Sequence, residues 1–309
     1  MGLVVLILFV VGIRKLSPTR SGGCIRIGVV NPTMSTKREP AAGTKAEQQE
    51  AEELSSPGGH ILYLAVQTEG EHELDRTNSA LAWSGLAAGL SMGFSLLSEG
   101  LLRAHLPDAP WRPLITKFGY SLGFLIVILG RQQLFTENTL TVILPLLRKK
   151  DFPTLVNVAR LWGIVLGANL AGALIFAWVL GNTNAVGPDI RQAITEIARQ
   201  TYQADPGSIL LRGIFAGWLI ALMVWLLPFA EAGRVWVIML LTYIVGLGGF
   251  SHIIAGSVDA LYLVGVGEKS VAAYLFQFML PTLIGNIIGG VSLVAAFAHA
   301  QFISRVKPK

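Results

Sequence analysis

The sequence predicts an all-α membrane protein with six transmembrane helices, of which the second and fifth are broken. Charged residues make up only 14% of the 309 residues, whereas an ordinary soluble domain carries roughly 25%. Hydrophobic residues make up 52%, and the mean hydropathy is +0.58. After residue 78 the chain consists mostly of long apolar segments separated by short polar ones. This profile argues against a soluble enzyme, a disordered chain and a nucleic-acid-binding protein.

Residues 1–77 are predicted to form a polar N-terminal tail. Its first 13 residues are apolar but too few to cross a bilayer, which takes roughly 20. Basic residues follow this run rather than precede it, unlike in a signal peptide. One interpretation is therefore that translation starts at Met34, and the other is that residues 1–33 belong to the protein. Residues 35–58 have the composition of a solvated tail.

The last part of the tail, residues 61–75, mixes apolar and acidic side chains. Two interpretations are open for it. It forms either an interfacial helix that packs against the inner mouth of a pore, or a partly ordered linker into the membrane.

Residues 78–303 are predicted to form a transmembrane pore domain, and residues 304–309 a basic tail. Two apolar segments, 114–147 and 235–266, are too long for one crossing, and polar residues interrupt them near 131–138 and 248–259. Irregular backbone inside a membrane is tolerated only where protein or a cavity surrounds it, so these breaks predict the position of a pore. The other four segments are interpreted as single crossings: 79–102, 155–180, 209–229 and 271–302.

The breaks fall in the second segment of each group of three, which indicates an inverted 3+3 repeat. Matching residues support this interpretation, because Asn169 and Asn286 each stand mid-span in an Asn-x-x-Gly pattern. Small residues also recur every four positions in the first and fourth spans, where they would let helices approach closely. They are Gly85, Gly89 and Gly93 in the first span, and Gly213 and Gly217 in the fourth.

The distribution of basic residues predicts the orientation in the membrane. With a cytoplasmic N-terminus, the inner segments carry eight Lys or Arg residues and the outer loops six. The compact cluster at 148–150 favours this orientation, so we expect a multi-pass protein of a bacterial inner membrane with both termini in the cytoplasm. The single cysteine, Cys24, excludes an internal disulfide, and the five histidines lack metal-ligand spacing. No metal, cofactor or nucleic-acid partner is expected.

Three motifs lie in order on the predicted second, fifth and sixth spans. They read Leu-Phe-Thr-Glu-Asn at 134–138, Gly-Phe-Ser-His at 249–252 and Gly-Asn-Ile-Ile-Gly-Gly at 285–290. Through these motifs, residues 79–302 resemble the formate/nitrite transporter family. The resemblance implies an aquaporin-like fold and a homopentamer with one pore in each subunit. It also implies transport of a small monovalent anion such as formate, nitrite, hydrosulfide or lactate, rather than an enzymatic activity.

The resemblance also implies roles for individual residues. His252 corresponds to the family's central pore histidine, Asn286 to the asparagine that hydrogen-bonds it, and Phe135 to a constriction aromatic. Val245 stands where the family often has a second constriction phenylalanine. The other pore or substrate residues expected at the two breaks are Arg131, Thr136, Glu137, Asn138, Phe250 and Ser251.

The sequence departs from the family pattern in three places. The family's vestibule lysine would fall near Thr201, but no lysine is present there and the nearest cation is Arg199. Gly217 replaces an asparagine of the fourth span, and Glu137 replaces a small residue of the Leu-Phe-Thr motif. Arg131 either pairs with Glu137 or replaces the missing vestibule cation. These departures indicate a divergent branch whose substrate need not be formate.

A histidine has a clear chemical use in such a pore. An anion that enters an apolar constriction loses much of its hydration energy. Protonation removes most of that cost, and histidine exchanges protons near neutral pH. The half-helices that follow each break would add partial positive charge at their N-termini. We therefore predict permeation of weak acids, with His252 as a proton relay or polar waypoint.

Three other functions are compatible with the sequence. A channel for water or small neutral solutes is favoured by the missing lysine and by Glu137. An intramembrane hydrolase would use Ser251, His252 and Asp259, but the sequence shows no matched nucleophile arrangement, and Asp259 is expected instead to cap or close the second break. The third is a non-conducting scaffold. Flux measurements across pH distinguish these functions from an anion channel.

Overall fold

The computed structural model describes residues 59–295 of the chain. The predictions for the apolar run 1–13, the start at Met34, the tail 35–58 and the basic tail 304–309 lie outside the described residues, as does the end of the sixth segment. Within 59–295 the regular secondary structure is helical, in agreement with the predicted all-α class.

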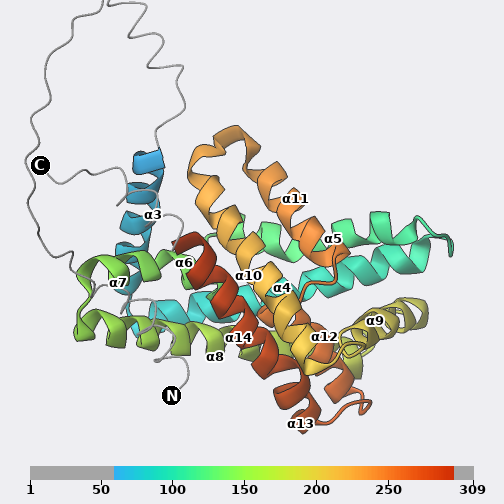
Figure 1. Ribbon diagram of the computed structural model, residues 1–309. Helices are drawn as coiled ribbons and strands as arrows, with labels where there is room; N and C mark the ends of the chain where they lie inside the picture. Colours follow the sequence, from blue (N-terminus) through green and yellow to red (C-terminus); the bar gives the residue numbers. More distant parts are fainter. Residues whose placement is uncertain (1–58, 296–309) are drawn as a thin grey trace, which may run out of the picture. The chain divides into compact units, whose positions relative to one another are not determined.

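The helices follow the chain in the order shown in Figure 1. The N-terminal half of the described region contains α3 (Gly59–Leu74), α4 (Asn78–His105), α5 (Arg112–Leu129), α6 (Phe135–Thr141), α7 (Ile143–Lys149), α8 (Phe152–Asn182) and α9 (Pro188–Gln200). The C-terminal half contains α10 (Pro206–Leu226), the short turns η1 (Leu227–Phe229) and η2 (Glu231–Gly233), α11 (Arg234–Leu247), α12 (Ile253–Gly265), α13 (Val271–Ala273), η3 (Tyr274–Met279), α14 (Leu280–Ile288) and η4 (Gly289–Ala295).

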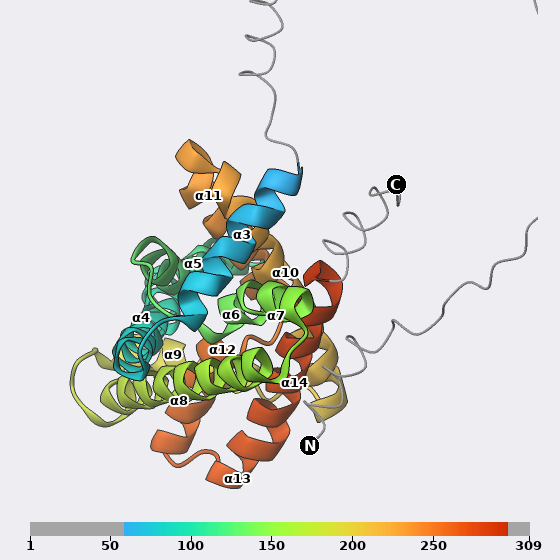
Figure 2. The same cartoon turned by 90° about the vertical axis from the view of Figure 1, so that its left-hand side faces the viewer.

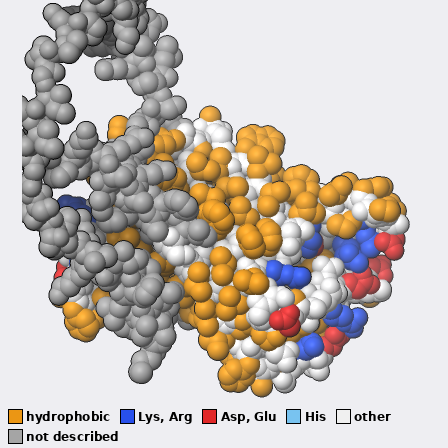
Figure 3. Space-filling model, in the orientation of Figure 1, with side chains coloured by type: hydrophobic (Ala, Val, Ile, Leu, Met, Phe, Trp, Pro, Cys, Tyr) orange, Lys and Arg blue, Asp and Glu red, His pale blue; other side chains and the backbone are white. Residues whose placement is uncertain are grey.

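Five helical segments of the described region are long and apolar enough to cross a membrane: 78–105, 112–129, 152–182, 206–229 and 271–292. Two shorter apolar helices, α11 and α12, lie within the predicted fifth span. Large apolar side chains face outward, and Trp83 and Trp236 are 71% and 63% exposed. Figure 3 shows hydrophobic side chains over most of the visible face of the described region, with charged ones gathered near the end where α9 lies. The protein is a multi-pass membrane protein.

Two helices lie outside the predicted spans. The interval 61–75 is helical, as α3, which packs against α6, α7 and α8 (Figure 2). Helix α9 was not predicted from the sequence. It buries Ala193, Ile194, Ile197 and Ala198 against neighbouring helices and places charged residues on its other side. The charged residues give α9 a low mean hydropathy. Only the spacing of its apolar residues distinguishes this segment from a polar loop in the sequence.

Helix packing divides the described region into two similar groups. In the first, α4 packs against α5 and α8; in the second, α10 packs against α11 and α14. The short helix after each break packs on the other group, since α6 contacts α10 and α12 contacts α8 and α4. Both breaks are thereby enclosed by helices from both halves of the chain.

Glycines let the first and third helices of each group touch. A Cβ atom on Gly89 of α4 would overlap the backbone of Asn169 in α8, and one on Gly217 of α10 would overlap the backbone of Asn286 in α14. The two contacts are equivalent, and they explain the predicted small-residue spacing as close helix packing.

Alanine at Gly89 or Gly217 is expected to destabilise the protein, because the backbone atoms it meets cannot rotate away. Overpacking of this kind costs about 1–3 kcal/mol. Gly163 of α8 is the matched control, since a Cβ there meets nothing within 4 Å. Gly163→Ala should leave the thermal unfolding midpoint in detergent unchanged or raise it. Equal midpoints for Gly89→Ala, Gly217→Ala and wild type would contradict the packing described.

Candidate functional site

The two helix breaks follow the same backbone course. Residues 130–134 separate α5 from α6, and residues 248–252 separate α11 from α12. Each break turns at a residue with positive φ, Arg131 at 48° and Gly249 at 60°. Each ends in an extended residue that begins the next helix, Leu134 with φ −103° and ψ 128° and His252 with φ −103° and ψ 129°.

Asn169 of α8 holds the first break in place. Its side-chain oxygen accepts a hydrogen bond from the Phe135 backbone N–H at 2.9 Å. Its amide nitrogen donates to the carbonyl oxygens of Gln133 at 2.8 Å and Gly85 at 2.7 Å. Asn169 is completely buried, so these three bonds satisfy backbone groups that water does not reach.

Asn286 of α14 does the same at the second break. Its oxygen accepts from the Ile253 backbone N–H at 2.8 Å, and its nitrogen donates to the carbonyl oxygens of Ser251 at 2.8 Å and Gly213 at 2.9 Å. Each asparagine therefore ties a break to the third and first long helices of its own group. The local correspondence of the two halves extends from the backbone to these side chains.

His252 faces the first break from the second. Its Nδ1 accepts hydrogen bonds from the backbone N–H groups of Ile254 and Ala255, at 3.3 and 3.2 Å, and so caps α12. Its Nε2 lies 2.8 Å from the hydroxyl oxygen of Thr136 in α6. Because Nδ1 is an acceptor, the neutral imidazole carries its proton on Nε2 and donates it to Thr136. The ring of Phe124 packs edge-on against the imidazole with centroids 4.9 Å apart.

This geometry corrects the expected bond between Asn286 and His252. The described hydrogen bonds of Asn286 all go to backbone groups, and both imidazole nitrogens have other partners. The asparagine positions His252 through the peptide groups on either side of it. The same backbone bonds use the first N–H groups of α6 and α12, so these amides are not free to bind an anion directly.

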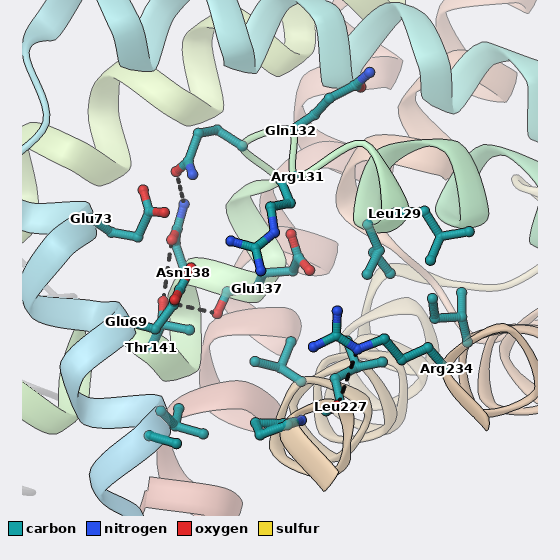
Figure 4. Close-up of a pocket in the computed structure, with 17 residues that line it drawn as sticks. Glu69, Glu73, Leu129, Arg131, Gln132, Glu137, Asn138, Thr141, Leu227 and Arg234 are labelled. Atoms are coloured by element: carbon teal, nitrogen blue, oxygen red, sulfur yellow. Dashed lines mark hydrogen bonds between the residues drawn. The ribbon is translucent and has the colours of Figure 1, made fainter. Parts of the chain in front are cut away.

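The α3-side cavity opens beside the first break and has a volume of about 270 Å³. Figure 4 shows charged side chains from three regions around it: Glu69 and Glu73 from α3, Arg131 and Glu137 at the break, and Arg234 from α11. Burial raises the pKa of Glu73, and its ion pair with Arg76 opposes the rise. The cavity lining also includes the predicted residue Asn138, which donates to Gln133 at 3.0 Å.

The α9-side cavity opens beside the second break and also has a volume of about 270 Å³. His252 lines it together with the predicted residues Val245, Phe250 and Ser251. Four charged side chains lie in its wall: Glu99 from α4, Lys117 from α5, Arg212 from α10 and Asp259 from α12.

The two cavities open toward opposite ends of the same three helices. Helices α5, α10 and α11 each line the α9-side cavity near one end and the α3-side cavity near the other. His252, which lines the α9-side cavity, contacts Thr136 of α6, and the neighbours of Thr136 in the chain, Glu137 and Asn138, line the α3-side cavity. Helix α5 contributes Lys117 to the α9-side cavity and Ile128 to the α3-side cavity. Helix α10 contributes Arg212 and Val224 to these two cavities in the same order, and α11 contributes Val245 and Ile238.

Several predicted residues occupy places that their motifs alone did not specify. Phe135 lines neither cavity; it is 1% exposed and packs edge-on against Trp162 with centroids 5.7 Å apart. Phe250 stacks on Phe215. The expectation that Asp259 caps the second break is wrong, because α12 already begins at residue 253 and His252 is its cap. Asp259 lies further along α12, in the cavity wall.

Charged residues around the missing lysine also differ from expectation. Thr201 lines the α9-side cavity and donates to Asp259 at 3.4 Å. Arg199 does not line that cavity and pairs instead with Glu268 at 2.7 Å, which lowers the pKa of Glu268. Sequence reasoning missed Lys117, which reaches the cavity from α5 and forms an ion pair with the buried Glu99.

Arg131 and Glu137 are not joined by any ion pair of the described residues. Of the two interpretations of Arg131, pairing with Glu137 is therefore not what the geometry shows. The described residues also contain no group of three or more His, Cys, Asp or Glu side chains arranged to hold a metal ion.

The family model described as formate/nitrite transporter matches residues 60–300 of the chain. Inner membrane protein YfdC of Escherichia coli strain K12 is 44% identical over 243 residues, covering 78% of this chain and 77% of that protein. Formate channel BtFdhC of Bacillus thuringiensis is 24% identical over 248 residues, covering 77% of this chain and 92% of that one.

Two solved structures share the fold. A pentameric formate channel with formate bound superposes with a TM-score of 0.61 at 18% identity, over 77% of this chain and 99% of that chain. An FNT family ion channel superposes with a TM-score of 0.65 at 18% identity, over 80% of this chain and 100% of that chain. From the match of the family model and the relationship to YfdC, the chain belongs to the formate/nitrite transporter family.

Proposed function

We propose that the protein passes small monovalent anions, or their weak acids, across the membrane between the α3-side and α9-side cavities. The observation that carries this proposal is that two cavities open toward opposite ends of α5, α10 and α11, and that His252, in the wall of one, contacts Thr136, whose neighbours Glu137 and Asn138 line the other. Membership of the formate/nitrite transporter family supports it.

The charges in the cavities support a polar but not a strongly cationic path. Arg212 on one side and Arg131 and Arg234 on the other attract an anion. Carboxylates in both cavities oppose that attraction, and the Lys117–Glu99 pair is neutral as a unit. An anion that takes up a proton before the apolar part of the path avoids most of its desolvation cost. The neutral imidazole of His252 can donate a hydrogen bond from Nε2–H to such a solute at this point.

The finer architecture belongs to the same proposal. We place six crossings in the membrane, the second formed by α5, α6 and α7 and the fifth by α11 and α12, in an inverted repeat with an aquaporin-like path. The equivalent bonds of Asn169 and Asn286 support the repeat. A homopentamer in a bacterial inner membrane, with cytoplasmic termini, is supported by the solved pentameric channel of the same fold, by YfdC and by the basic cluster at 148–150.

The proposal is tested by stopped-flow flux measurements on proteoliposomes that contain the full-length protein. Formate, nitrite, hydrosulfide, lactate and water are compared with sulfate across a range of pH. We expect one or more of the monovalent anions to cross faster than through protein-free liposomes, with flux rising as the pH falls and more of the weak acid is protonated. Sulfate should not cross, because it stays charged.

Two other results of these flux measurements would contradict the proposal. Water flux that does not depend on pH, without anion flux, would replace the proposal with a neutral-solute channel. The absence of flux for every solute would favour a scaffold that does not conduct.

A further inference from the structure

The α3-side cavity contains more unpaired charge than a path for simple anions requires. Four of its side chains form no ion pair with the side chains that the structure describes, which do not include that of Glu231. Their side-chain hydrogen bonds to the described residues are limited to a weak one from Arg234 to a backbone carbonyl at 3.4 Å. They are Glu69, Glu137, Arg131 and Arg234, two of each sign. Glu73, which also lies in the wall, is already paired with Arg76.

These charges are separated in space. Figure 4 shows Glu69 and Glu73 on the α3 wall, Arg234 on the opposite side, and Arg131 and Glu137 between them. Glu69 and Glu73 are four residues apart on α3, so they lie on the same face of the helix. The cavity therefore has an acidic wall on α3, a basic residue on the opposite side and one residue of each sign between them.

Arg131 occupies its place at an energetic cost. Its φ of 48° lies in the left-handed region, and the equivalent position in the second break is Gly249. A glycine adopts this conformation without strain, whereas another residue there costs about 1 kcal/mol or more. Position 131 therefore carries a side chain although its backbone conformation favours glycine, and that side chain lines the cavity. Such strain at a cavity points to a role in binding.

A simple ion gains little from this arrangement. An anion is attracted by the two arginines and repelled by the glutamates, whereas a cation is attracted by the glutamates and repelled by the arginines. A molecule that carries both charges gains at both walls. The cavity volume of about 270 Å³ accommodates a ligand of a few non-hydrogen atoms.

We propose that the α3-side cavity binds a small zwitterion, with an ammonium group toward Glu69 and Glu137 and a carboxylate toward Arg131 and Arg234. The ligand class is that of a small amino acid. This site goes beyond the proposed transport of anions, and its occupancy can be measured without any flux.

The test measures binding to the full-length protein in detergent, by isothermal titration calorimetry and by the shift of the thermal unfolding midpoint. The zwitterions are glycine, β-alanine and 4-aminobutyrate, which separate the two charges by increasing distances. Propionate and propylamine carry one charge each and are the matched controls. We expect saturable binding of at least one zwitterion and none of either control at the same concentration and ionic strength.

Two substitutions identify the cavity as the site. Arg131→Gly removes the guanidinium and relieves the backbone strain, so the variant should fold at least as well as wild type. Glu137→Gln removes one carboxylate without changing the size of the side chain. Each should raise the dissociation constant of the zwitterion by about tenfold or more. Arg199→Gln, at a residue that does not line this cavity, should leave the constant unchanged.

The inference is overturned if no zwitterion binds, or if propionate or propylamine binds as tightly as the zwitterions. Unchanged affinity in both Arg131→Gly and Glu137→Gln would also overturn it. Because no outcome depends on transport, failure of this inference and failure of the proposed function are distinguishable.

Discussion

Replacing Asn169 or Asn286 with alanine is expected to lower the free energy of unfolding by roughly 3 kcal/mol or more. Each substitution leaves two carbonyl oxygens and one N–H group without their partners in the buried interior. Each unsatisfied buried group costs about 1–3 kcal/mol. The measurement is thermal unfolding in detergent, together with the elution of the folded oligomer in size-exclusion chromatography.

A second substitution separates the hydrogen bonds from the side-chain volume. Asn169→Asp keeps the shape of the side chain and the acceptor for Phe135 but loses both donors, so it should be as damaging as alanine. The control is Asn182→Ala, because Asn182 is exposed and donates one bond to Trp178 within its own helix. If Asn169→Ala and Asn182→Ala unfolded at the same temperature, the bracing role of Asn169 would be excluded.

Replacing His252 is expected to reduce anion flux by about tenfold, since the solute loses a hydrogen-bond donor worth roughly 1–1.5 kcal/mol in the apolar part of the path. His252→Ala also removes the cap of α12, which costs about 1 kcal/mol. His252→Asn separates the two effects, because asparagine is a good helix cap but lacks the imidazole Nε2–H that reaches Thr136. Both variants should lose flux in proteoliposomes, and the asparagine variant should keep the wild-type unfolding midpoint.

Thr136→Val tests the partner of His252. It preserves the shape of the side chain and removes the hydroxyl that accepts the hydrogen bond from Nε2–H. We expect an altered dependence of flux on pH rather than loss of the fold. Wild-type flux and pH dependence in His252→Asn would rule out the histidine as a participant in permeation.

Local apolar patterns predicted most of the membrane helices. The segments 79–102, 155–180 and 209–229 correspond to α4, α8 and the helical segment from α10 to η1, because a buried or lipid-facing helix needs an uninterrupted run of apolar residues. Polar residues predicted interruptions near 131–138 and 248–259, but both ranges were too long, because α6 begins at residue 135 and α12 at residue 253. Helix α9 was missed because only one of its faces is apolar.

The partners of individual side chains depended on contacts across the chain. Asn286 was correctly singled out by its motif, but the expected bond to His252 was wrong because backbone groups of the break take all its described bonds. Lys117 gave no local signal, since its pairing with Glu99 and its place in the cavity arise from the packing of α4 on α5. The strain at Arg131 likewise became visible only from its backbone angle.

We expect the two cavities to open on opposite faces of the membrane and to connect at His252. The most direct test labels single cysteines from one side at a time, in a Cys24→Ser background. Gln132→Cys places a thiol in the α3-side cavity and Ser251→Cys places one in the α9-side cavity. A charged, membrane-impermeant methanethiosulfonate reagent is applied to right-side-out or to inverted vesicles, and anion flux is measured before and after.

We predict that Gln132→Cys reacts only in inverted vesicles and Ser251→Cys only in right-side-out vesicles, and that either reaction blocks flux. Reaction of both cysteines from the same side, or complete labelling with flux unchanged, would contradict a path through these cavities.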